Sequence, residues 1–201
     1  MNENTKKDLK ISLLIGSVAG VLILPILVNI NFPLTLLKSL TVIIGLAIFT
    51  AVGYLVGNFI SRYIPVIFQF VKFGIVGGLN AMIDLGVLNF LIYLTGFATG
   101  IWYSGFKSFS FIIAVVNSYY WNKHWTFNSE NKHSTFEFVE FFLVSLVGFS
   151  INVGVASLVV NFVGAPVGVS AGIWANVGAV AAALSALMWN FIGMKFFVFK
   201  K

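Results

Sequence analysis

The sequence contains no cysteine and very little charge. Its 201 residues include 12 Lys and Arg and 6 Asp and Glu, so 9% are charged, against about 25% in a typical soluble domain. The lack of cysteine excludes disulfides and thiolate metal sites. With 59% hydrophobic residues, a water-soluble fold is excluded, because its exterior must be largely polar. The basic residues are scattered singly between apolar stretches, so the net charge of +6 indicates membrane topology and no nucleic acid partner.

Long apolar stretches predict an all-α integral membrane protein with six transmembrane helices. A helix that crosses a bilayer needs about 20 predominantly apolar residues. Pro and Gly are the strongest local breaks in such stretches. The six spans are expected within residues 11–37, 39–61, 73–106, 102–121 and 141–194, the last stretch holding two spans that are separated near Gly164–Pro166.

The basic residues between the spans predict the orientation of the chain. Cytoplasmic loops of membrane proteins carry an excess of Lys and Arg. Alternate loops collect Lys38 and Lys107 on one side, and ten basic residues on the other. Both termini are therefore expected in the cytoplasm. The ten residues are Lys6, Lys7, Lys10, Arg62, Lys72, Lys123, Lys132, Lys195, Lys200 and Lys201.

An internal repeat divides most of the chain into two similar halves. Residues 68–73 resemble residues 136–141, and the Lys-x-aromatic-x-Phe pattern of residues 123–127 recurs at residues 195–199. Such self-similarity indicates repeated structural units. The predicted core, residues 67–201, therefore consists of two parallel two-helix repeats, 67–127 and 135–199. Residues 1–66 form an additional N-terminal two-helix hairpin.

Asp84 is the most informative polar residue within a predicted span. It lies twelve residues beyond Lys72, about 18 Å along a helix and thus near the bilayer centre. Intramembrane carboxylates usually face a bundle interior or a water-filled cavity. Asn80 lies one turn earlier, and Asn152 is the repeat equivalent of Asp84. These side chains are expected either to line a polar groove that binds substrate or to fix helix packing through hydrogen bonds.

Lys107 is unusual because it lies within the fourth predicted span, on the predicted outer side. A long basic side chain near a helix end can extend towards the membrane surface while its methylene groups remain in lipid. Snorkelling of this kind past Trp102 is the expected arrangement. Two alternatives are contact with a lipid phosphate and pairing with Asp84.

Polar and aromatic residues also gather at the predicted cytoplasmic ends of the even-numbered spans. Lys123 and Lys195 occupy matching positions in the two repeats. Their ammonium groups could hold a lipid phosphate, Trp125 could stack on a sugar ring, and Asn117 and Asn122 could contact a head group. Ordinary positive-inside flanking and an aromatic belt explain the same residues without a substrate.

Three pairs of glycines spaced four residues apart predict close helix packing. They are Gly16 with Gly20, Gly53 with Gly57, and Gly74 with Gly78. Small residues at this spacing allow neighbouring backbones to approach each other in a membrane. No catalytic set, cofactor motif or metal-ligand spacing accompanies them, so an enzyme is not expected.

Residues 70–80 with Asp84, then residues 117–127 and 190–199, resemble the GtrA-like family. Members are small four-helix membrane proteins of cell-envelope glycosylation, and the resemblance covers residues 67–201. It implies movement of a polyprenyl-phosphate-linked sugar across a bacterial or archaeal cytoplasmic membrane for polysaccharide or teichoic-acid glycosylation. The N-terminal hairpin departs from the minimal family pattern, which leaves partner choice and homo-oligomer formation open.

Two other functions are compatible with these residues. A membrane-anchoring or stabilising subunit of a polyprenyl-phosphate glycosyltransferase would depend on the loop of residues 123–140 and on aromatic faces more than on its intramembrane polar groups. A proton-coupled exporter of small cations would depend on a single membrane carboxylate such as Asp84. The lysines of the predicted cytoplasmic rim argue against cations as cargo.

Overall fold

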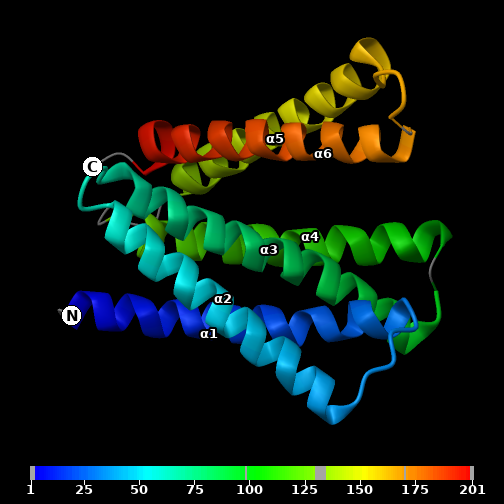
Figure 1. Cartoon of the computed structure of the whole chain (residues 1–201), viewed down its shortest axis with the longest axis horizontal. Helices are drawn as coiled ribbons and strands as arrows, with labels where there is room; N and C mark the ends of the chain where they lie inside the picture. Colours follow the sequence, from blue (N-terminus) through cyan, green and yellow to red (C-terminus); the bar gives the residue numbers. More distant parts are fainter. Residues whose placement is uncertain (1–2, 98, 130–134, 170, 200–201) are drawn as a thin grey trace. The chain divides into compact units, whose positions relative to one another are not determined.

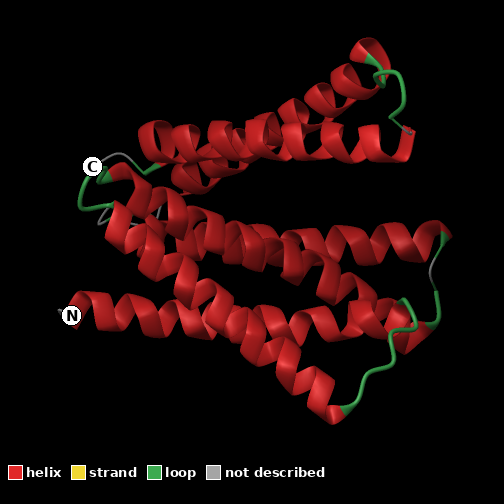
Figure 2. Ribbon diagram, viewed as in Figure 1, coloured by secondary structure: helices red, strands yellow, loops and turns green. Residues whose placement is uncertain are grey.

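The computed structural model describes residues 3–97, 99–129, 135–169 and 171–199, and the described residues are almost entirely helical (Figures 1 and 2). The α-helices are α1 (Glu3–Asn29), α2 (Leu36–Ile60), α3 (Val66–Thr95), α4 (Gly100–Trp121), α5 (Thr135–Ser157) and α6 (Ala171–Gly193), and three π-helices are η1 (Asn122–Thr126), η2 (Leu158–Val163) and η3 (Met194–Val198). Short loops connect α1 to α2 and α2 to α3.

The length and apolarity of the helices confirm the prediction of an all-α membrane protein. Five helical segments are long and apolar enough to cross a bilayer, namely α1, α2, α3, α5 continued by η2, and the part of α6 and η3 from Val180 to Val198. α4 has 22 residues, a length of about 33 Å that also suffices. Lys107 and several serines make α4 less apolar than α2 and α3. The predicted orientation of the termini stays a prediction.

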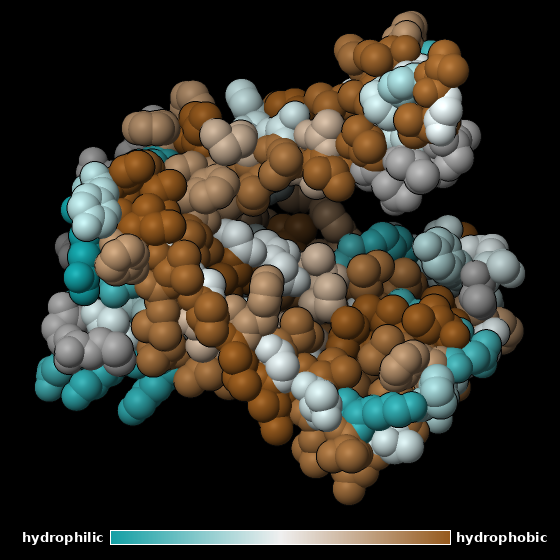
Figure 3. All heavy atoms as spheres, in the orientation of Figure 1, coloured by the Kyte–Doolittle hydropathy of each residue, from teal (hydrophilic) through white to brown (hydrophobic). Residues whose placement is uncertain are grey.

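Large apolar side chains cover the outside of the helices. On α2, Ile44, Ile48, Phe49 and Val52 each expose more than half of their surface, and hydrophobic residues dominate the visible surface of this helix in Figure 3. A soluble protein rarely exposes a continuous apolar area of this kind. Lipid is therefore the medium that this surface fits.

Helices α1 to α4 and η1 belong to a first compact unit, residues 1–128. α1 packs against α2 and α3, and α3 packs against α4. Buried apolar residues from all four helices, including Ile15, Tyr54, Val76 and Ala114, form its core. The N-terminal hairpin thus shares a core with the first predicted repeat, whereas the sequence predicts a domain boundary at residue 66.

Glycines allow α1 to approach its neighbours closely. A Cβ atom at Gly16 would lie 2.5 Å from the Leu46 carbonyl oxygen, and one at Gly20 would lie 2.5 Å from Ile43 Cα. The predicted packing role holds for these two residues and for Gly57, which meets Val71 on α3. Gly53, Gly74 and Gly78 have open space where a Cβ would lie, so no close approach explains them.

Gly16→Ala is expected to destabilise the first unit by about 2 kcal/mol, because the new methyl group would meet the backbone of α2 and the helices would have to separate. Thermal unfolding of the purified protein in detergent measures the effect. Gly45→Ala is the matched control, since nothing lies within 4 Å of a Cβ at that exposed position on α2. Equal unfolding temperatures for the two variants would contradict the packing role of Gly16.

A second compact unit, residues 129–201, contains α5, η2, α6 and η3. α5 and α6 form a hairpin that turns at Gly164 to Pro166, as predicted, with Gly164 at φ +71°. The indole N–H of Trp189 donates to the Val144 carbonyl oxygen at 3.1 Å, and that of Trp174 donates to the Val159 carbonyl oxygen at 2.9 Å. These bonds tie the two helices together along their length.

The last helix of each unit ends in a five-residue π-helix. In η1 the Phe127 N–H donates to the Asn122 carbonyl oxygen at 2.9 Å, and in η3 the Phe199 N–H donates to the Met194 carbonyl oxygen at 2.8 Å. Each final Phe packs on an aromatic ring of its own unit. The ring centres are 6.1 Å apart for Phe73 and Phe127 and 6.2 Å apart for Phe141 and Phe199. The two units therefore share a local structure at the positions where the sequence repeats.

Candidate functional site

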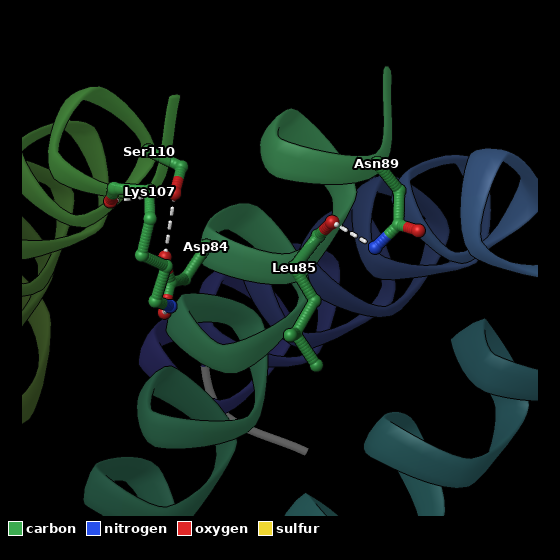
Figure 4. A network of polar contacts seen from close by, with 5 residues as sticks. All are labelled: Asp84, Leu85, Asn89, Lys107 and Ser110. Atoms are coloured by element: carbon green, nitrogen blue, oxygen red, sulfur yellow. Dashed lines mark hydrogen bonds and ion pairs between the residues drawn. The ribbon is translucent and has the colours of Figure 1, made fainter. Parts of the chain in front are cut away.

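A group of polar side chains connects α3 and α4 around Asp84 (Figure 4). The Lys107 ammonium forms an ion pair with Asp84 Oδ2. The Ser110 hydroxyl donates to Asp84 Oδ1 at 2.7 Å and also lies 3.0 Å from the Lys107 carbonyl oxygen. The Lys107 and Asp84 side chains are 39% and 20% exposed, whereas Ser110 is fully buried. Asp84 is thus held from two sides, and the Lys107 side chain is the most accessible of the three.

A second polar contact joins the same two helices, one helical turn away along α3. The Asn117 amide donates to Asn80 Oδ1 at 2.7 Å. With the ion pair, it gives α3 and α4 a row of polar contacts, hereafter the α3–α4 seam, which consists of Asn80, Asp84, Lys107, Ser110 and Asn117. Because ten residues separate Lys107 from Asn117 on α4, the seam extends over about 15 Å, half of a typical hydrocarbon core.

The pairing of Lys107 with Asp84 corrects the expectation of snorkelling. The Lys107 side chain reaches across to α3 because an isolated carboxylate and an isolated ammonium are both costly at membrane depth. Pairing was one of the two alternatives considered from the sequence. It also explains how α4, which carries a lysine among its apolar residues, can be accommodated in a membrane beside α3.

The lysines at the ends of α4 and α6 each lie over an aromatic ring of the preceding turn. The Lys123 ammonium is 5.8 Å from the Tyr119 ring centre, and the Lys195 ammonium is 5.7 Å from the Phe191 ring centre. Cation–π contacts of this kind stabilise a cation near an aromatic face. Lys123 is 1% exposed, whereas Lys195 is partly exposed, so Lys195 is the better placed of the two to meet a ligand.

Two other predicted site residues, Asn122 and Asn152, belong to the first and the second compact unit, respectively. Asn122 is 2% exposed and its amide donates to the Ser118 carbonyl oxygen at 2.9 Å within the first unit. This bond connects η1 to the last turn of α4. Asn152 lies on α5 in the second unit and is partly exposed. Its proposed equivalence to Asp84 rests on the sequence repeat.

A buried ion pair that was not predicted connects α1 to α3. The Lys72 ammonium lies 2.6 Å from Asp8 Oδ2, with side-chain exposures of 8% and 16%. The indole N–H of Trp125 donates to Asp8 Oδ1 at 2.9 Å. The Lys72 ammonium also lies 4.3 Å from the centre of the Phe68 ring. Asp8 therefore holds the start of α1 against both α3 and η1.

Trp125 has a different environment from the one expected for a sugar-stacking residue. The residue is 5% exposed, and its indole N–H donates to Asp8. The C-terminal end of α1 is joined to α3 as well, because the Asn29 amide donates to Asn89 Oδ1 at 2.9 Å. The N-terminal hairpin is therefore fastened to α3 at both ends. No periodic pattern in the sequence relates residues 8 and 72, so only the positive charge of Lys72 near a span boundary hinted at this contact.

The fold and these contacts define a multi-pass membrane protein with a polar helix seam. Residues 72–199 match the family described as GtrA/DPMS, transmembrane domain, and the chain belongs to this family. A relative from Bacillus subtilis (strain 168), described as the uncharacterized membrane protein YngA, is 30% identical over 128 residues, which cover 64% of this chain and 77% of the relative. No solved structure matches the chain. The matched residues include the whole seam but neither α1 nor α2.

Proposed function

We propose that this protein moves a polyprenyl-phosphate-linked sugar across the cytoplasmic membrane, where the sugar serves cell-envelope glycosylation. Membership of the GtrA/DPMS family supports a function connected with such lipids. The observation that carries the proposal is the partly exposed ion pair of Asp84 and Lys107 within membrane-spanning helices. Charged groups at this depth commonly mark substrate pathways.

The seam fits a lipid phosphate sugar for a physical reason. A phosphate and a sugar in hydrocarbon without hydrogen-bond partners would be prohibitively unstable. Lys107 offers a cation for the phosphate, and the amides of Asn80 and Asn117 offer hydrogen-bonding groups for sugar hydroxyls. The prenyl chain would remain in lipid beside the helices.

Transbilayer movement in liposomes tests the proposal directly. A polyprenyl-phosphate sugar is placed in the outer leaflet of liposomes that contain the purified protein. It is expected to reach the inner leaflet faster than in protein-free liposomes. Several sugars are needed, because the proposal leaves the sugar open. Accessibility of the lipid to a membrane-impermeant reagent measures its side. Movement no faster than in protein-free liposomes, with a folded sample and all sugars tried, would refute the transport proposal.

A glycosyltransferase-stabilising subunit remains the alternative if that assay is negative. The apolar outer face of α2, where Phe49 is 74% exposed and Phe59 is 56% exposed, fits a membrane helix of such a partner as well as it fits lipid. The cation-exporter hypothesis has less support. Lys107 already neutralises Asp84, and the described spans offer no second Asp or Glu at comparable depth.

A further inference from the structure

We infer that the Asp84 carboxylate competes with the lipid phosphate for the Lys107 ammonium. Asp84 holds the ammonium when no phosphate is bound, and by drawing the ammonium back it allows the phosphate to leave. This inference rests on the proposed function and assigns the two charged residues of the α3–α4 seam opposite roles. Lys107 binds the anion, and Asp84 limits how tightly it is bound.

The geometry separates a fixed half of the ion pair from a mobile half. Ser110 is fully buried and its hydroxyl donates to Asp84 Oδ1 at 2.7 Å, so the carboxylate has a partner that a ligand cannot reach. Lys107 has a long flexible side chain that is 39% exposed, twice the 20% exposure of Asp84. The Lys107 side chain is therefore the more accessible half of the pair, and a phosphate can draw its ammonium away while Ser110 continues to hold Asp84.

Charge explains why the competition promotes transport. The empty pair is neutral, whereas phosphate on Lys107 leaves the Asp84 carboxylate without its cation. The uncharged Ser110 hydroxyl only partly replaces it, since hydrogen bonding to a neutral group is weaker than an ion pair. α1 beyond Lys10 and α2 beyond Lys38 contain no charged residue, so no other cation of these helices compensates the carboxylate. The bound state is consequently destabilised, which favours release, and passage requires binding that is not too strong.

The experiment measures binding of farnesyl phosphate to the purified full-length protein in detergent, with farnesol as the neutral control ligand. Asp84→Asn is expected to bind farnesyl phosphate about fivefold more tightly than wild type, the upper range for a partly exposed ion pair. Asp84→Glu keeps the competing charge and is expected to bind like wild type. Lys107→Gln is expected to lose phosphate-dependent binding. Farnesol binding should not differ among these proteins.

Ser110→Ala provides an independent measurement if Asp84→Asn does not fold. The hydroxyl is buried and cannot contact the ligand, but without it Asp84 depends more strongly on Lys107. The inference therefore predicts weaker farnesyl phosphate binding in this variant. Affinity at or above that of wild type for Ser110→Ala, or at or below it for Asp84→Asn, would overturn the inference. So would the absence of saturable phosphate-dependent binding to wild type.

Lipid movement by the same proteins separates the inference from the proposed function. Asp84→Asn is expected to move polyprenyl-phosphate sugar more slowly than wild type while it binds farnesyl phosphate more tightly. If the wild-type protein moves lipid but Asp84→Asn binds farnesyl phosphate more weakly than wild type, the competitor role is overturned and the transport proposal stays intact. If the affinities of wild type and the variants for farnesyl phosphate follow the expected order but the wild-type protein moves no lipid, transport is refuted and the competition for Lys107 stands.

Discussion

Replacement of Lys107 by Met is expected to reduce lipid movement to the rate of protein-free liposomes. The variant lacks the ammonium that is proposed to bind the phosphate, and it leaves Asp84 as an unpaired carboxylate within the membrane. The second effect is expected to lower the free energy of unfolding by about 2 kcal/mol, a little less than the cost of one charge at the centre of a spanning helix. The liposome assay and thermal unfolding in detergent measure the two effects separately.

Two further variants show which effect causes the loss of transport. Asp84→Asn combined with Lys107→Met removes both charges, so it should recover most of the stability and remain inactive. Lys38→Met is the matched control, because Lys38 is an exposed lysine of the same predicted outer side and its ammonium donates to the Pro33 carbonyl oxygen at the surface. Movement at the wild-type rate by Lys107→Met would show that the seam is not the pathway.

Replacement of Asp8 by Ala is expected to lower the stability of the first unit by about 3 kcal/mol. The Lys72 ammonium would lose its counterion while its side chain is 8% exposed, and the Trp125 N–H would lose its acceptor. Removal of one partner from a buried ion pair leaves an uncompensated charge, which is more destabilising than loss of an exposed pair. Thermal unfolding of the purified protein measures the decrease.

Glu3→Gln is the control for this prediction, since it removes one negative charge from the exposed start of the same helix. It should leave the unfolding temperature close to that of wild type. Asp8→Glu should retain part of the stability because a carboxylate remains within reach of Lys72. If Asp8→Ala unfolds at the same temperature as Glu3→Gln, the ion pair does not hold α1 in place.

The class of protein and most helix positions could be predicted from the sequence. Each long apolar stretch must form a helix in a membrane, because lipid offers no hydrogen bonds to the backbone. The turn at Gly164 to Pro166 was also predictable, because these residues interrupt an apolar stretch. The candidate site was partly predictable, because a charge such as Asp84 within a span has few stable environments.

The partners of these residues were decided by the tertiary structure. Helical periodicity relates side chains within one helix, but Lys107 is 23 residues from Asp84 and Lys72 is 64 residues from Asp8 along the chain. Whether such groups meet depends on which helices are neighbours and how they are rotated. The sequence by itself determined that this is a helical membrane protein with charged residues within its membrane-spanning segments. Packing determined that Lys107 pairs with Asp84 and that Asp8 fastens the N-terminal hairpin, because only helix packing brings distant residues within the few ångströms over which ion pairs and hydrogen bonds act.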